Sequence, residues 1–287
     1  MEAPGGPVFG QVYPVHQDHP SWSVHNVIAY EDRGISEVDS ASGAYMVDPT
    51  RAGIWALDLE SGTKQRVVPF GTSPTWSHDG AWIAFEHAGA IYVADASGAY
   101  IVKLTHTGLN HNPAWYPSDS SLVYDSNATS SLYSLWRIDI NGQNVNAVCD
   151  QVGLREGSWS VTGEQLVGTS ASRNYAQVHS LSAACEGTAL TSMTATIMNH
   201  PTFSPDGGLV AFAAKLEASP TPEVWVMDSL GGNLHQVTVG GGWSPSWSPD
   251  GSHMVYARPP GGRYSHETGV LWTLDLESGT TTQLTEW

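Results

Sequence analysis

The stretch SPSWSPDG at 244–251 decides the fold of this chain, because five related copies precede it. Each copy holds a central aromatic residue among small and polar residues, in most copies with Pro two positions before it. The other copies are HPSWSVHN at 19–26, SPTWSHDG at 73–80, NPAWYPSD at 112–119, EGSWSVTG at 156–163 and HPTFSPDG at 200–207. Successive aromatics lie 54, 39, 44, 44 and 44 residues apart. A period near 44 indicates stacked or radial units, each too small to bury its own core.

Each unit contains short apolar runs that predict strands. In the last unit these runs are MVYA at 254–257, LWTLD at 271–275 and TTQLT at 281–285, in addition to the aromatic segment. The runs are rich in β-branched and aromatic residues and are bounded by Gly, Asp, Ser and Pro, as strands are. Asp-Gly pairs form tight hairpin turns because Gly tolerates a positive φ. The sequence therefore predicts an all-β, six-bladed β-propeller with four antiparallel strands per blade, in which radial repetition shields the sheet edges.

The repeat resembles that of the TolB-type propellers, whose core is an aromatic residue followed by Ser-Pro-Asp-Gly, an "IAF" strand and an "IYVMD" strand. Residues 203–207 and 247–251 match it closely, whereas units one, three and four depart from the turn. The resemblance covers residues 19–287 and implies the fold. Similar repeats occur in TolB, in the propellers of prolyl oligopeptidases and tricorn-type proteases, and in oligogalacturonate lyases, so the resemblance does not imply one activity.

The expected organisation is a single propeller at 19–287 after an N-terminal extension at 1–18, with no second domain. The expected blades span about 19–68, 73–106, 112–150, 156–193, 199–240 and 244–287. No G-x-S-x-G nucleophile elbow occurs, which argues against a serine hydrolase.

Composition limits the partners. The net charge is −17, from 11 basic and 28 acidic residues, and nucleic acid is an unfavourable partner because phosphate binding needs clustered Lys and Arg. No apolar stretch approaches about 20 residues, so we expect no transmembrane segment. The start, MEAPGGPVFG, lacks the regions of a signal peptide. Because the resemblance implies a periplasmic or secreted protein, we expect an extracytoplasmic location with the signal peptide absent from this chain.

The two cysteines and the twelve tryptophans have mostly structural interpretations. Cys149 and Cys185 fall late in neighbouring units, where either a disulfide or two separate thiols is consistent with the sequence. Nine tryptophans occupy repeated positions and are expected to pack between blades. Trp82, Trp243 and Trp287 lie outside the pattern, and Trp243, within a glycine-rich connection, is the candidate for ligand contact.

Propeller geometry predicts one functional face. The chain enters each innermost strand from this entry face, and the loops between second and third strands return to it; their lengths differ greatly, with the longest at 31–53. Variable loops on a rigid scaffold tend to carry binding sites. The residues just before each Pro position should surround the axial channel on this face. The candidate residues for binding a ligand or partner are His19, His111, Asn112, Arg155, Glu156, His200 and Trp243.

Three of these candidates suggest a metal. His19, His111 and His200 belong to units one, three and five, and imidazoles that converge on the axis can hold a cation. The alternatives are that these residues contact a ligand directly, or cap strand ends and bind water or backbone, with no cofactor.

Three functions remain open. The resemblance to TolB implies a non-catalytic binding module that engages a protein partner, or a small polar ligand, at the mouth of the axial channel. The resemblance to oligogalacturonate lyases implies a metal-assisted polysaccharide lyase or hydrolase, with His19 or His200 as base and Arg155, Arg258 or Arg263 binding the substrate carboxylate. The third is a structural subunit that docks through its loops.

Overall fold

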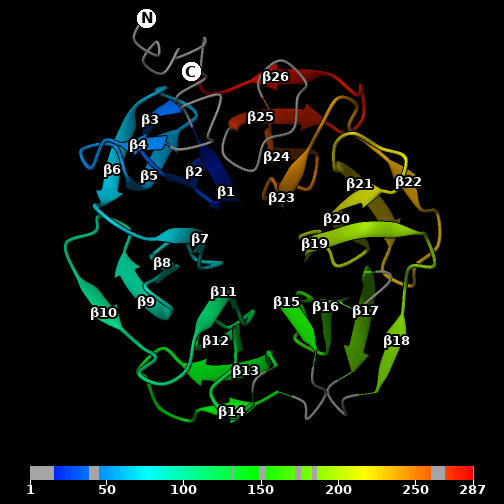
Figure 1. Cartoon of the computed structure of the whole chain (residues 1–287), viewed down its shortest axis with the longest axis horizontal. Coiled ribbons are helices and arrows are strands. Elements are labelled where there is room, and N and C mark those ends of the chain that lie inside the picture. The colour runs from blue at the N-terminus through cyan, green and yellow to red at the C-terminus, as the bar shows by residue number, and fades with distance from the viewer. Residues whose placement is uncertain are drawn as a thin grey trace, which may run out of the picture.

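The computed structural model describes residues 16–38, 45–130, 132–148, 153–171, 176–182, 186–259 and 269–286. Cys149, Cys185, Arg263 and Trp287, and with them the question of a disulfide, lie outside these residues. The described residues form six four-stranded antiparallel sheets around a central opening, with β1, β7, β11, β15, β19 and β23 innermost (Figure 1). They contain no helix, and so none that spans a bilayer. The predicted six-bladed, all-β propeller is confirmed.

Each blade is built from four strands of one repeat unit. Blade one contains β1 (Gln17–Trp22), β2 (Val27–Asp32), β5 (Gly53–Asp58) and β6 (Lys64–Val68). Blade two contains β7 (Thr72–Trp76), β8 (Trp82–His87), β9 (Ala90–Asp95) and β10 (Ile101–Lys103). Blade three contains β11 (Asn110–Trp115), β12 (Ser121–Ser126), β13 (Ser134–Asp139) and β14 (Asn146–Ala147).

The second half of the ring repeats this order. Blade four contains β15 (Leu154–Trp159), β16 (Gln165–Ala171), β17 (Ala176–Ser182) and β18 (Gly187–Ala189). Blade five contains β19 (Ala195–Phe203), β20 (Leu209–Leu216), β21 (Glu223–Asp228) and β22 (His235–Gln236). Blade six contains β23 (Trp243–Trp247), β24 (His253–Arg258), β25 (Val270–Asp275) and β26 (Thr281–Gln283). The predicted long loop of blade one adds a small hairpin of β3 (Ile35–Val38) and β4 (Tyr45–Val47).

The Ser-x-Asp-Gly part of the repeat forms the turn after the innermost strand. In blade two the Ser77 hydroxyl donates to Asp79 Oδ1 at 2.6 Å, and Gly80, with φ of 71°, donates its N–H to the Ser77 carbonyl. The same Ser-to-Asp bond, at 2.6 Å, occurs in blades five and six. The motif is repeated because the Asp and Ser side chains satisfy the backbone groups of a turn that needs Gly at a positive φ.

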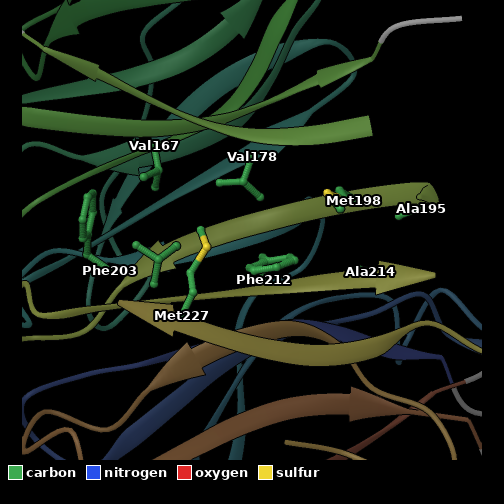
Figure 2. Packing of buried hydrophobic residues seen from close by; sticks show 9 residues of the cluster. Val167, Val178, Ala195, Met198, Phe203, Phe212, Ala214 and Met227 are labelled. Atoms are coloured by element: carbon green, nitrogen blue, oxygen red, sulfur yellow. The ribbon is translucent and has the colours of Figure 1, made fainter. Parts of the chain in front are cut away.

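Apolar side chains fill the spaces between neighbouring blades. Phe212 and Met227 of blade five pack against Val167 and Val178 of blade four, with Phe203 beside them (Figure 2). The repeated Trp76, Trp115 and Trp247 are buried in similar clusters, each made from two adjacent blades. The prediction that these aromatic residues pack between blades is therefore confirmed. The hydrophobic core therefore consists of separate clusters, each of which lies between neighbouring blades.

Among the described residues, blades six and one each keep their own four strands and are joined by an isolated bridge and by hydrogen bonds. The backbone N–H of Gln17 donates to the Gly269 carbonyl at 3.0 Å, and that of Trp22 donates to Ser246 Oγ at 3.1 Å. Beneath these bonds, Trp243 packs in a cluster that contains residues of both blades. We call this junction the seam. It joins the two ends of the described ring by packing and a few hydrogen bonds.

Candidate functional site

The innermost strand of every blade has an irregularity at the same place. In five blades the irregularity precedes a Pro, and in blade four Gly157 stands at the Pro position. The residue just before this position lies in the left-handed region, with φ between 47° and 57°, and the strand register shifts around it. Non-glycine residues rarely adopt this conformation, and each costs about 1–3 kcal/mol. These six bulge residues are His19, Ser73, Asn112, Glu156, His200 and Ser244. The structure therefore repeats one strained backbone while it varies the side chain.

The bulge residues line a cavity on the axis of the ring, with a volume of about 160 Å³. A second cavity of about 280 Å³ follows it toward the opposite face and is lined by the repeated aromatics. Thr75, Ala114, Ser158, Thr202 and Ser246 line both cavities, so the two adjoin along the axis. The polar bulge residues thus surround the entry-face end, as the sequence predicted, and the aromatic residues surround the other end.

Carboxylates, buried in Glu31 and Asp125 and partly buried in Glu86, accept hydrogen bonds from the bulges of blades two, three and four. Glu31 accepts the backbone N–H of Ser73 at 2.7 Å, and Asp125 accepts that of Glu156 at 2.7 Å. Glu86 accepts that of Asn112 at 3.3 Å. Each carboxylate comes from the second strand of the preceding blade. These bonds satisfy a donor that the bulge removes from the strand ladder.

The second-strand residues that face the bulges differ between the two halves of the ring. The position held by Glu31, Glu86 and Asp125 in blades one to three is taken by Thr169, Ala213 and Ala257 in blades four to six. In blade four, Glu156 itself accepts the N–H of His200 at 2.6 Å. Negative charge is therefore concentrated on the side of blades one to four, and blades five and six present apolar methyl groups.

The carboxyl of Asp125 is fully enclosed. It accepts from Asn112 Nδ2 at 2.8 Å and lies 3.5 Å from Arg155 Nε. Burial raises its pKa to about 7, and the nearby Glu156 charge acts in the same direction. The hydrogen bonds from Asn112 and from the Glu156 N–H act against this shift but do not cancel it.

His19 of blade one and His200 of blade five contact each other beside the innermost strand of blade six. Their Nε2 atoms are 3.1 Å apart, the rings are edge-on with centroids 4.7 Å apart, and Ser244 Oγ is 3.4 Å from His200 Nδ1. Burial lowers the pKa of His19, but Asp18 and Glu31 outweigh it and raise the pKa to about 10. Burial and the His19 charge lower the pKa of His200 to about 3. Near neutral pH, a cationic His19 therefore donates to a neutral His200.

The other predicted residues lie around this pair in different environments. His111 Nδ1 is 3.1 Å from Glu86 Oε2, and its ring packs on Tyr133. The guanidinium of Arg155 lies over the same Tyr133 ring, 4.7 Å from its centroid. Trp243 is 7% exposed, and it lines a cavity of about 190 Å³ beside His19 and His200. It is therefore mainly a core residue of the seam.

The structure does not bring the three predicted metal ligands together. His19 and His200 meet, but His111 is one residue before its bulge position and is bound to Glu86 instead. Among the described residues, the group whose possible ligand atoms all lie within 4.8 Å of one another is His16, Asp18 and Glu31. Sequence reasoning did not select this group because His16 precedes the first copy of the repeat. The available signal was the His-x-Asp alternation before Pro20.

Comparisons with known proteins agree with the fold. The chain resembles TolB from Acinetobacter baumannii (14% identity, 94% of this chain and 67% of that one, TM-score 0.62). It also resembles the propeller domain of the Trilobed protease from Pyrococcus furiosus (13% identity, 95% and 96%, TM-score 0.63). A third similar structure is an oligogalacturonate lyase in complex with manganese (17% identity, 95% and 73%, TM-score 0.52). At these identities the similarity shows the fold alone.

Sequence comparisons are more specific. No curated protein matches the chain. The model of the TolB beta propeller domain family matches residues 38–221, which is more than half of the chain. This confirms the resemblance found in the repeats, and the chain belongs to the TolB beta propeller domain family.

Proposed function

We propose that the protein is a non-catalytic binding module that takes a segment of a protein partner at the entry-face end of its axial channel. The observation that carries the proposal is the ring of six bulge residues, which have one backbone conformation and different side chains. Strained non-glycine residues tend to persist where they serve a function. A rigid ring with varied polar groups around one opening suits recognition of one particular segment.

The cavity limits what can enter. About 160 Å³ accommodates a few side chains or a chain end, but not a folded domain. Glu86 and Glu156 add negative charge at the rim. We therefore expect a segment that offers hydrogen-bond donors and a positive charge, with the remaining contacts made by the entry-face loops. By resemblance to its family, we place this binding outside the cytoplasm.

The alternative functions have weaker support. A lyase needs a free cation to bind a substrate carboxylate, but Arg155 interacts with Asp125 and Tyr133, and Arg258 lies over the Trp272 ring at 4.7 Å. A structural subunit gains support from the β3–β4 hairpin, where Met46 is 59% exposed and Val47 48%. Each alternative predicts a distinct outcome for one variant.

The experiment blocks each surface in turn and measures capture of the partner from the native source. Ser73→Trp fills the entry-face cavity and is expected to abolish capture. Val161→Trp, at the aromatic end, is the matched control and should retain it. Loss of capture with Val161→Trp alone would overturn the proposal. Loss with Met46→Ser alone would favour the structural subunit, and depolymerisation of oligogalacturonate that disappears in His200→Ala would favour the lyase.

A further inference from the structure

Three side chains beside the seam share one side of blade one. His16 and Asp18 are two residues apart, so their side chains point to the same face of the chain as it enters β1. Glu31, in β2, pairs directly with Asp18 in the antiparallel register. All three residues are buried, with exposed fractions of 4%, 7% and 3%. Backbone alternation and register therefore bring one imidazole and two carboxylates together in the interior.

The distances between these groups are those of ligands around an ion. His16 Nε2 lies 3.5 Å from Glu31 Oε1 and 3.9 Å from Asp18 Oδ2. Hydrogen-bonded partners lie about 2.7–3.2 Å apart, and neither pair reaches this range. Two ligands that each lie about 2.1 Å from one tetrahedral cation are about 3.4 Å apart. The pair of His16 and Glu31 is close to this ligand spacing, and the pair of His16 and Asp18 is wider, so the cluster leaves room for an ion between its members.

Charge in the cluster favours a cation. Two carboxylates within 4.8 Å of each other in the interior repel, and burial makes their charges costly. His19 offsets part of this charge, since its Nδ1 lies 3.1 Å from Glu31 Oε2 and 3.7 Å from Asp18 Oδ2. Within the described part of the chain, Nδ1 of His16 has no hydrogen-bond partner.

We propose that His16 Nε2, Asp18 Oδ2 and Glu31 Oε1 bind one divalent transition-metal ion of the Zn²⁺ type. Imidazole nitrogen with carboxylate oxygen is a common ligand set for such ions, whereas Ca²⁺ and Mg²⁺ take oxygen ligands, six or more of them. This set differs from the three histidines that the sequence suggested, and it does not depend on the proposed function.

The location assigns the ion a structural role. His16 forms an isolated bridge with Gly269 of blade six, and its carbonyl accepts the Arg33 N–H at 3.1 Å. Glu31 accepts the Ser73 N–H of blade two. An ion held by His16 and Glu31 therefore links blades six, one and two at the point where the ring closes. Because it binds only the folded protein, the ion raises the melting temperature.

The test titrates Zn²⁺ into chelator-treated full-length protein by calorimetry, with thermal melting in parallel. We expect one equivalent to bind and the melting temperature to rise. Glu31→Gln and His16→Gln should each weaken binding at least tenfold and remove the rise. Glu31→Gln keeps an oxygen that accepts the Ser73 N–H, so its fold is preserved. His78→Gln and His111→Gln, which remove imidazoles that contact carboxylates elsewhere, are matched controls that should leave binding unchanged.

A second readout uses the unmodified protein. Co²⁺ should replace Zn²⁺ and give a visible spectrum typical of four or five ligands, with paramagnetic shifts at His16 in nuclear magnetic resonance spectra. Absence of one-equivalent binding, or binding that persists in both variants, overturns the proposal. Binding lost in His111→Gln but retained in His16→Gln would identify the three-histidine set instead.

Discussion

Glu156 accepts the backbone N–H of His200 at 2.6 Å, and this bond joins blade four to blade five at the axis. It replaces a contact that the carboxylates of the second strands make in earlier blades, because blade four has Thr169 at that position. Thr169 Oγ1 in turn lies 3.4 Å from Glu156 Oε2. One bulge residue thus both lines the cavity and supports the next bulge.

Removing this acceptor should destabilise the ring. Glu156→Ala leaves the His200 N–H without its partner in a buried position, at a cost of about 1–3 kcal/mol. Glu156→Gln retains an acceptor oxygen, and we expect a smaller loss. Urea unfolding of the two variants checks the difference. Equal losses would mean that the bond to His200 contributes little.

Asp125 should make stability depend on pH. Its pKa is raised in the folded protein to about 7, so the folded state binds a proton more tightly than the unfolded state. The associated stability is complete below the unfolded pKa, near 4, and is lost as pH rises through 7, at a slope of at most about 1.4 kcal/mol per pH unit.

The measurement for Asp125 is urea unfolding at pH 5, 6, 7 and 8, compared with Asp125→Asn. Aspartates with lowered pKa, such as Asp250, titrate below this window and do not contribute. The unfolding free energy of the unmodified protein should fall between pH 5 and 7 more steeply than that of the variant. Parallel curves would contradict a raised pKa at Asp125.

The seam should tolerate no added volume at Gly269. A Cβ there would lie 2.9 Å from the Gln17 carbonyl and 3.0 Å from Trp243 Cζ2. We expect Gly269→Ala to cost about 1–3 kcal/mol, because overpacking forces neighbouring groups to move. Gly208→Ala is the control, since its nearest contact is an ordinary 3.4 Å. Melting temperatures compare the two, and equal values would show that the seam relaxes freely.

The packing between blades four and five should dominate local stability. Phe212 is fully buried there, and Phe212→Ala should cost about 3–5 kcal/mol through lost burial and a residual cavity. Tyr100→Ala removes an aromatic ring that is largely exposed and should cost far less. Chemical unfolding measures both, and a small loss at Phe212 would mean that the interface refills the space.

The sequence was sufficient to predict the fold because the aromatic position recurs six times and the Ser-x-Asp-Gly turn follows it in three of the six units. Each Ser-x-Asp-Gly turn satisfies its own backbone, and each repeated aromatic residue fills the space between two blades, so the pattern indicates strand number and ring size together. The β3–β4 hairpin escaped prediction because its strands are short and lie within a long polar loop.

The candidate site was only partly predictable. The bulge positions follow from the Pro in the repeat, and this places His19, Asn112, Glu156 and His200 at the cavity. Which side chains meet there depends on contacts between blades. His111 pairs with Glu86 of the preceding blade, and Trp243 is buried at the seam. No pattern within one unit contains this information.

The way the ring closes has a consequence for how such a chain can evolve. In the described residues, each four-stranded sheet is formed by strands of a single unit, so a gene that duplicates or deletes one whole unit still encodes only complete sheets. Neighbouring blades then need only a small change in the angle between them. A ring whose last sheet borrows a strand from the far end of the chain lacks this modular route, because its closing sheet depends on both ends at once.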